Sequence, residues 1–178
     1  MTQYGNSINL SDPIKMTKNE INLVKDFDCG NEVINEYLKS KSHCDPQTVT
    51  YIVIDNDNGS VICYYSLSCS GFVIESNHKF TIYPAVEIKM FAIDENYQHM
   101  PYSEDIEDGS LSDILFSDVI GFIYDFTENY CGADKIILYS VPDAKSFYIR
   151  NGFTEFMEYM LKSESWFLDG CVPMYLDL

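Results

Sequence analysis

The strongest constraint on the fold is a long amphipathic segment between two strand-like segments. Residues 111–130 carry apolar side chains at helical spacing along one stripe. Ser110 and Asp113 form a pattern like a capping box at the start of this helix. The flanking segments 86–94 and 135–141 are rich in β-branched and other apolar residues. Because strand–helix–strand connections within one sheet are right-handed crossovers, these two strands are expected to be parallel.

The rest of the chain predicts shorter elements and one domain. With 178 residues and 46% hydrophobic content, the chain suffices for one core and is short for two ordinary domains. We therefore expect an α/β fold in a single domain over 1–178, with one mixed sheet and helices on both faces. Its other expected elements are a weak strand at 12–18, a helix at 28–42 capped by Asp28, strands at 48–55 and 60–68 joined at Asn58-Gly59, a short helix at 143–152 capped by Asp143, and strands near 153–161 and at 172–177.

The charge balance bears on possible partners. The sequence has 28 acidic residues and 11 lysines plus arginines, for a net charge of −17. Proteins that grip many phosphates usually carry a basic surface, so a nucleic-acid partner is predicted to be unlikely. An acidic surface attracts cations, which favours a polyamine, a basic peptide or another cationic amine. The alternative is that the charge only keeps the protein soluble.

Cysteine usage and hydropathy suggest a cytoplasmic protein. Six cysteines stand at irregular spacings without a CxxC pair, and the three histidines show no metal-ligand spacing. We expect free and mostly buried thiols and no metal site, and the alternative is a disulfide or a metal site. The first residues show no signal-peptide pattern, and no apolar run approaches the length of a membrane span.

Four sequence motifs occur in an order that is typical of one enzyme superfamily. They are FDCGNEVINEYL (27–38), FAIDENYQ (91–98), LYSVPDAKSFYIRNGF (138–153) and MYLDL (174–178). With these motifs the chain resembles the GNAT superfamily of N-acetyltransferases, and most closely its bacterial members with an FDCGNE-type first helix. The resemblance implies the GNAT fold, which has a mostly antiparallel sheet with one splayed parallel strand pair. It also implies acetyl-CoA as co-substrate, with the pantetheine arm entering the splay.

The resemblance also implies roles for particular residues. Backbone groups of Phe91, Ala92 and Ile93 would bind the pantetheine arm and polarise the thioester carbonyl. Tyr148 would be the general acid for the thiolate leaving group, and helix 111–130 would point its N-terminus at the pyrophosphate. The other candidate cofactor-binding residues are Gln98, Ser140, Ala144 and Phe147. Gly109, Ser110 and Ser112 join them if the start of the helix replaces the family's glycine loop.

The chemistry of amine acetylation adds one more candidate. An alkyl ammonium with a pKa near 10.4 cannot attack until it loses a proton, and a nearby carboxylate can accept that proton directly or through water. Glu87, at the start of the strand 86–94, is the candidate base. The alternatives are a packing role for Tyr148 and an ordinary solvated position for Glu87.

The loop before helix 111–130 departs from the family pattern. Pro101 and Ser103 stand where the superfamily usually has glycines. The loop also carries four acids, at positions 104, 105, 107 and 108, which would repel the phosphates of CoA if they pointed inward. Either the acidic stretch arches away and leaves the amides of 109–112 to bind the phosphates, or the site has lost CoA.

Three functions therefore compete. The first is an acetyl-CoA-dependent N-acetyltransferase acting on a small cationic amine or on a protein amino group. The second is a non-catalytic module of the same fold that binds a partner through its acidic face. The third is a toxin-like GNAT acting on aminoacyl-tRNA, which the resemblance of residues 27–38 favours and the net charge disfavours. A homodimer is compatible with each.

Overall fold

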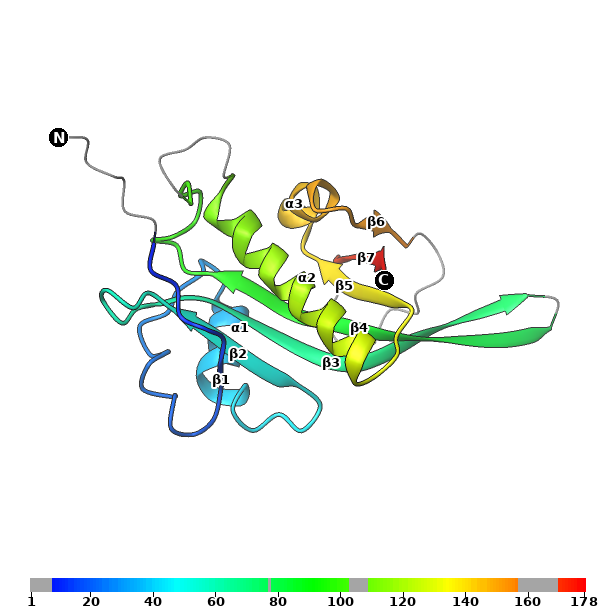
Figure 1. Cartoon of the computed structure of the whole chain (residues 1–178), viewed down its shortest axis with the longest axis horizontal. Coiled ribbons are helices and arrows are strands. Elements are labelled where there is room, and N and C mark those ends of the chain that lie inside the picture. The colour runs from blue at the N-terminus through cyan, green and yellow to red at the C-terminus, as the bar shows by residue number, and fades with distance from the viewer. Residues whose placement is uncertain (1–7, 77, 103–108, 157–169) are drawn as a thin grey trace. The chain divides into compact units, whose positions relative to one another are not determined.

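The computed structural model describes residues 8–76, 78–102, 109–156 and 170–178 (Figure 1). Within these residues a seven-stranded sheet has the order β1-β2-β3-β4-β5-β7-β6. The strands are β1 (Ile14–Lys15), β2 (Val49–Ile54), β3 (Val61–Ser76), β4 (Lys79–Ile93), β5 (Lys135–Ser140), β6 (Thr154–Glu155) and β7 (Val172–Asp177), and the α-helices are α1 (Glu32–Glu36), α2 (Leu111–Asn129) and α3 (Lys145–Arg150). The expected α/β class with a mixed sheet is confirmed.

The chain forms two compact units, each built from separate segments. The first comprises Met1–Ser66 and Met90–Val119, and the second comprises Leu67–Lys89 and Ile120–Leu178. Strands β3 and β4 and helix α2 each continue from one unit into the other.

In the first unit, the sheet has a helix on each face. Ala92 of β4 packs with Tyr64 and Phe27 in a buried cluster that also contacts Ile34 of α1. Its neighbour Ile93 packs in a second cluster with the first turns of α2. Because successive residues of a strand point to opposite faces, α1 and α2 cover opposite faces of this part of the sheet, as the sequence predicted.

In the second unit, β5 lies between a parallel and an antiparallel neighbour. Strand β4 pairs with β5 in parallel from Ala85↔Lys135 to Ile88↔Leu138, as predicted, and β5 pairs antiparallel with β7 along its whole length. The parallel register ends at Ile88 and Leu138, although β5 continues to Ser140 and β4 to Ile93. One parallel pair in a mostly antiparallel sheet agrees with the fold class that the resemblance implies.

The first helix begins later than predicted. Asp28 is not its N-cap, because its carboxylate accepts hydrogen bonds from the backbone of Gly30 (2.9 Å) and the side chain of Asn35 (2.6 Å). Asn31 caps the helix instead, with its Oδ1 accepting from two backbone amides of the first turn. After five residues α1 continues as a π-helical turn over Tyr37–Lys41, so the predicted span 28–42 is only partly α-helical.

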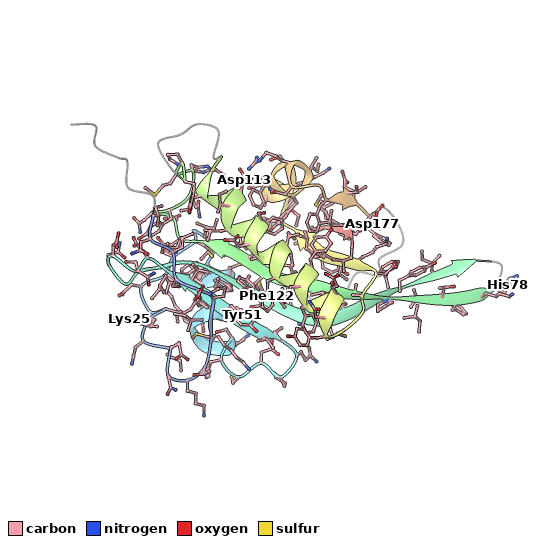
Figure 2. All side chains as sticks on the ribbon, in the orientation of Figure 1. Lys25, Tyr51, His78, Asp113, Phe122 and Asp177 are labelled. Atoms are coloured by element: carbon pink, nitrogen blue, oxygen red, sulfur yellow. The ribbon has the colours of Figure 1, made fainter. Side chains whose placement is uncertain are left out.

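The largest difference from the prediction is that β3 and β4 are much longer than 60–68 and 86–94. Residues 69–85, predicted as a loop, form the end of β3 and the beginning of β4, which together make a long two-stranded ribbon (Figure 1). His78, with a φ of 60°, lies at the turn of this ribbon (Figure 2). The polar turn residues and Pro84 led to the prediction of a loop. The residues on each side of the turn alternate and include β-branched and aromatic types, which are typical of strands.

The C-terminal elements need smaller corrections. Asp143 is not a helix cap: it lies in a 3-10 turn over Pro142–Ala144, and Ala144 precedes α3. Strand β6 covers two residues of the predicted strand 153–161, of which 157–161 lie outside the described residues. Strand β7 agrees with the predicted strand at 172–177.

The cysteines are free, as expected, but mostly not buried. Cys63 and Cys171 are buried, Cys29 is half-buried, and the others, Cys44, Cys69 and Cys131, are exposed. In the described part of the chain, no group of three or more His, Cys, Asp and Glu side chains could hold a metal ion. No helix among the described residues is long and apolar enough to cross a membrane.

The buried thiol of Cys63 makes stability sensitive to alkaline pH. Burial raises the pKa of Cys63 from 9.0 to about 12. Above pH 9 the unfolded chain loses this proton while the folded chain keeps it, so the stabilisation is complete below pH 9 and declines as the pH rises toward 12. Urea unfolding at pH 7.5, 9, 10 and 11 is expected to show that the free energy of unfolding of wild type declines above pH 9. In Cys63→Ala the decline just above pH 9 is expected to be absent, because the variant has no buried thiol. An equal decline in both proteins would contradict this expectation.

Candidate functional site

The side chains at the end of β4 are packed within the first unit. Ala92 and Ile93 are buried in the two core clusters of the first unit. The ring of Phe91 packs edge-on against Phe116 of α2, with 4.9 Å between the centroids. All three side chains therefore contribute to packing, and a ligand contact through their main-chain groups stays a prediction.

A network of hydrogen bonds holds the residues that follow β4. Gln98 donates from Nε2 to the carbonyls of Ile93 (2.8 Å) and Cys29 (3.2 Å). The buried carboxylate of Asp94 accepts from the backbone amide of Asp28 at 3.0 Å, and the amide of Glu95 donates to the Asp28 carbonyl at 2.8 Å. Gln98, predicted as a cofactor contact, thus positions the strand end. The sequence prediction missed Asp94, and its position within the motif 91–98 was the only signal for it.

The N-terminus of α2 is capped as predicted. The amide of Asp113 donates to Ser110 Oγ (3.2 Å), and Ser110 Oγ donates to the carboxylate of Asp113 (2.6 Å). Gly109 has a φ of +78°, which favours glycine at this position. The amide of Leu111 donates to the Met100 carbonyl at 2.9 Å. Of the amides of 109–112 that the sequence assigned to the phosphates, this one already has a partner.

An acidic side chain lies at the phosphate end of the predicted site. Asp113 is in the first turn of α2, where a carboxylate is stabilised by the helix dipole (Figure 2). Ser112 is the residue before it, and Ser110 uses its hydroxyl to bind this carboxylate. The four acids of the loop at 104, 105, 107 and 108, and Ser103, lie outside the described residues, so the predicted course of this loop stays a prediction.

In the second unit, β5 leads directly into α3. Ser140, at the end of β5, is buried and donates from Oγ to the carbonyl of Val141 (2.8 Å). The amide of Ala144 donates to the same carbonyl at 3.1 Å, which tightens the turn before the helix. Phe147 is half-buried, and the Arg150 guanidinium lies 5.3 Å from its ring centroid. Ser140 and Ala144 are thus brought together at one turn, with Phe147 one helical turn further on.

Tyr148 is the buried phenol of α3. Its side chain is 8% exposed and lies between the rings of Phe147 (5.2 Å between centroids) and Phe153 (6.0 Å). Burial raises the pKa of Tyr148 well above its usual value of 10. The phenol therefore stays protonated at neutral and moderately alkaline pH, as a proton donor must.

Glu87 lies on β4 within the parallel pairing. It pairs with Ile137 and points to the same face as Tyr139, two residues further along β5. Burial, and then the nearby Glu87 carboxylate, raise the pKa of Tyr139. Glu87 is only half-buried, and the same face carries the aromatic cluster of Phe72 and Phe156. Ser140 points to the opposite face of β5, so the predicted base and this predicted cofactor residue lie on different faces.

The first unit also contains a hollow that the sequence prediction missed. It has a volume of about 370 Å³ and is lined by Asp28, Gly30, Glu32, Asn35, Glu36 and Lys39. Its lining has three carboxylates and one ammonium group, so it is acidic. Hydrogen bonds from Gly30 and Asn35 lower the pKa of the Asp28 carboxyl, which keeps it ionised.

Comparison with known proteins gives a consistent result at the level of structure. No family model matches the sequence, and no curated protein matches it either. Among solved structures, the chain is similar to a bacterial toxin (TM-score 0.71, 18% identity), over 96% of this chain and 91% of that one. It is also similar to a tyrosine-to-phenylalanine mutant of KacT (0.68, 19%) and to AtaT complexed with acetyl-methionyl-tRNAfMet (0.68, 18%), each over 95% of both chains.

AtaT and KacT are toxins with the GNAT fold, and the likeness spans nearly the whole chain. The chain has the GNAT fold. The resemblance inferred from the four sequence motifs is thereby confirmed. In this chain, the residues predicted to bind the cofactor come from both units. The end of β4 and the start of α2 belong to the first unit, and the end of β5 and α3 belong to the second.

Proposed function

We propose that this protein is an acetyl-CoA-dependent N-acetyltransferase, and that its acceptor is the amino group of an aminoacyl-tRNA. The observation that carries the proposal is the likeness to AtaT complexed with acetyl-methionyl-tRNAfMet, over 95% of both chains. A related structure is described as AtaTR bound with AcCoA, which supports acetyl-CoA as the co-substrate. The motif at 27–38, which resembles that of toxin-like GNAT proteins, supports the same acceptor.

The proposed reaction is a direct transfer of the acetyl group. The neutral amine attacks the thioester carbonyl carbon, the amide C–N bond forms, the C–S bond breaks, and the nitrogen loses its extra proton to solvent or to a base. Main-chain groups near Phe91 and Ile93 stabilise the developing oxyanion, and Tyr148 donates its proton to the departing sulfur. The low-dielectric surroundings that raise the Tyr148 pKa also make a neighbouring thiolate more basic, which favours this donation.

A second acceptor class is favoured by the charge of the molecule. With a net charge of −17, long-range attraction favours a small cationic amine over a polyanion. The acidic hollow beside α1 adds to this preference. Against it, residues 15–41 carry five of the eleven basic residues and five acidic residues, so this part of the first unit is neutral although the whole chain is acidic.

A transfer assay with two acceptors distinguishes these classes. Purified protein is incubated with radiolabelled acetyl-CoA and either charged tRNA or spermidine. The proposal expects label on the charged tRNA that mild alkali releases as N-acetyl amino acid, and no label on uncharged tRNA. Label on spermidine alone would show that the acceptor is a small cationic amine.

A charge-neutral variant at the helix start tests how CoA is held. Asp113→Asn keeps the side-chain oxygen that accepts from Ser110 but removes one negative charge near the expected phosphates. A unit charge pair at about 8 Å and an effective dielectric of about 40 is worth about 1 kcal/mol, so acetyl-CoA affinity is expected to rise about fivefold. Isothermal titration measures it, with Asp125→Asn near the other end of α2 as the control. Equal gains in both variants would indicate a general charge effect.

Removal of the Glu87 carboxylate is expected to affect the two acceptor classes differently. An α-amino group has a pKa of about 8 and is partly neutral at pH 7.5, whereas an alkyl ammonium near 10.4 needs a base. Glu87→Gln is therefore expected to slow transfer to an alkyl amine at least about 100-fold and transfer to an α-amino group much less. Rates for both acceptors are measured from pH 6.5 to 9.5. Equal losses of transfer rate with both acceptors would show that Glu87 is not the base.

A further inference from the structure

A buried carboxylate joins the end of β4 to the residues before α1. Asp94 is 5% exposed, and its Oδ2 accepts from the backbone amide of Asp28 at 3.0 Å. Its Oδ1 accepts from the backbone amide (3.0 Å) and the side-chain amide (2.8 Å) of Asn96. In the part of the chain that the structure describes, no lysine or arginine forms an ion pair with Asp94. The buried charge is therefore stabilised by these hydrogen bonds rather than by a cation.

The segment 28–31 is bound to the rest of the first unit through residues 94–98. Locally, Asn35 accepts from the amide of Cys29 at 3.0 Å and donates to the carboxylate of Asp28 at 2.6 Å. Beyond Asn35, the hydrogen bonds of the segment within the described residues have three partners: the Asp94 carboxylate, the Glu95 amide and the Gln98 side chain. The Asp94 carboxylate is thus one of three groups that hold this segment in place.

The two segments approach so closely that a glycine is needed. Gly30 has a φ of +80°, and a Cβ added to it would lie 2.5 Å from Oε1 of Glu95. A larger residue at this position would strain the backbone and displace the Glu95 side chain. Cys29 packs against the buried cluster that contains Ala92, so the segment lies on the face of β4 that carries α1.

The end of β4 is fixed without the Asp94 carboxylate. The backbone amide of Asp94 donates to the Ile62 carbonyl of β3 at 2.9 Å. Ile93 is buried in the cluster that contains the first turns of α2. Loss of the Asp94 carboxylate is therefore expected to release the segment 28–31 and to leave the strand end where it is.

We propose that Asp94 is a positioning residue for acetyl transfer, an inference that rests on the proposed function. The expected phosphate site is the N-terminus of α2, which covers one face of β4. The face that carries α1 is then left for the acceptor, and Asp28, Gly30 and Asn31 of the segment are exposed there. By holding this segment against the strand end, Asp94 keeps the acceptor amine in position for attack on the thioester carbon.

Kinetics of Asp94→Ala test the proposal with the acceptor that wild type acetylates, charged tRNA or spermidine. The variant removes the oxygens that accept from Asp28 and Asn96. We expect kcat/KM for the acceptor to fall at least about tenfold, because a misplaced reactant reacts more slowly, and the Kd of acetyl-CoA to stay within about threefold of wild type. Asp94→Asn keeps one acceptor oxygen, so its kcat/KM is expected to lie between those of wild type and Asp94→Ala.

Asp55→Ala is the matched control for the loss of a buried carboxylate. Asp55 is 8% exposed, and its carboxylate accepts from three groups: the Asp57 amide (3.0 Å), the Asn58 side-chain amide (2.8 Å) and the Tyr97 hydroxyl (3.1 Å). None of these groups belongs to the segment 28–31. Thermal unfolding is expected to show a loss of stability in both alanine variants, whereas kcat/KM for the acceptor is expected to fall only in Asp94→Ala.

Amide hydrogen exchange tests the structural step separately from activity. In Asp94→Ala, exchange in a peptide that contains residues 28–31 is expected to become at least about tenfold faster, while exchange at the end of β4 is expected to stay as in wild type. Unchanged exchange at 28–31 would overturn the proposal.

The kinetic outcomes distinguish this inference from the proposed function. A wild-type kcat/KM in Asp94→Ala, an equal loss in Asp55→Ala, or acetyl-CoA binding that weakens as much as transfer would each overturn the role of Asp94 and leave the proposed function intact. A wild type that acetylates neither acceptor would overturn the proposed function and this inference together.

Discussion

Tyr148→Phe is expected to lower the turnover number for acetyl transfer at least about 100-fold, with acetyl-CoA affinity within about threefold of wild type. The variant keeps the ring that packs between Phe147 and Phe153 and removes only the proton donor. An effect on turnover without an effect on binding identifies an interaction made in the transition state. Steady-state kinetics and isothermal titration with acetyl-CoA give the two quantities.

The matched control for this variant is Tyr130→Phe. Tyr130 follows α2 and is 78% exposed, so loss of its hydroxyl is expected to change neither turnover nor binding. If Tyr148→Phe retained wild-type turnover, the phenol would have a packing role, which was the alternative from the sequence. If both turnover and binding were lost, thermal unfolding would show whether the variant is folded.

Phe116→Ala is expected to destabilise the folded protein by about 3–5 kcal/mol. Phe116 is fully buried, and its ring holds Phe91 at the end of β4 against α2. Removing it leaves a cavity beneath the strand end that the proposal assigns to the thioester. For a chain of this size the melting temperature is expected to fall by roughly 6–20 °C.

The control on the same helix is Phe122→Ala. Phe122 is 37% exposed and Phe116 is fully buried, so the same change of side chain is expected to cost less at Phe122. Urea unfolding of the two variants compares them under one condition. Similar losses of unfolding free energy from both variants would contradict a special contribution of the contact between β4 and α2.

Elements with a strong local pattern could be predicted from the sequence. Helix α2 was recognisable from its apolar stripe and from the pair Ser110 and Asp113, which do form the cap. The parallel pairing of β4 with β5 followed from the connection through α2. In both cases the information lies within one short stretch of sequence.

Features that depend on distant contacts could not be predicted. The start of α1 is displaced because Asp28 binds Gly30 and Asn35, while its amide is held by Asp94 from 66 residues away. The ribbon was missed because its polar turn and Pro84 have the composition of a loop, although the alternating apolar residues form strands. The candidate site was predicted mainly by resemblance, since Phe91, Ala92 and Ile93 have side chains typical of any core.

Binding of acetyl-CoA to the wild-type protein is the most direct test of the proposed function. Isothermal titration is expected to show one acetyl-CoA bound per chain. Subsequent addition of charged tRNA is expected to release free CoA thiol. No heat of binding at millimolar acetyl-CoA, from a protein shown to be folded, would contradict the account and leave a GNAT fold that binds partners without catalysis.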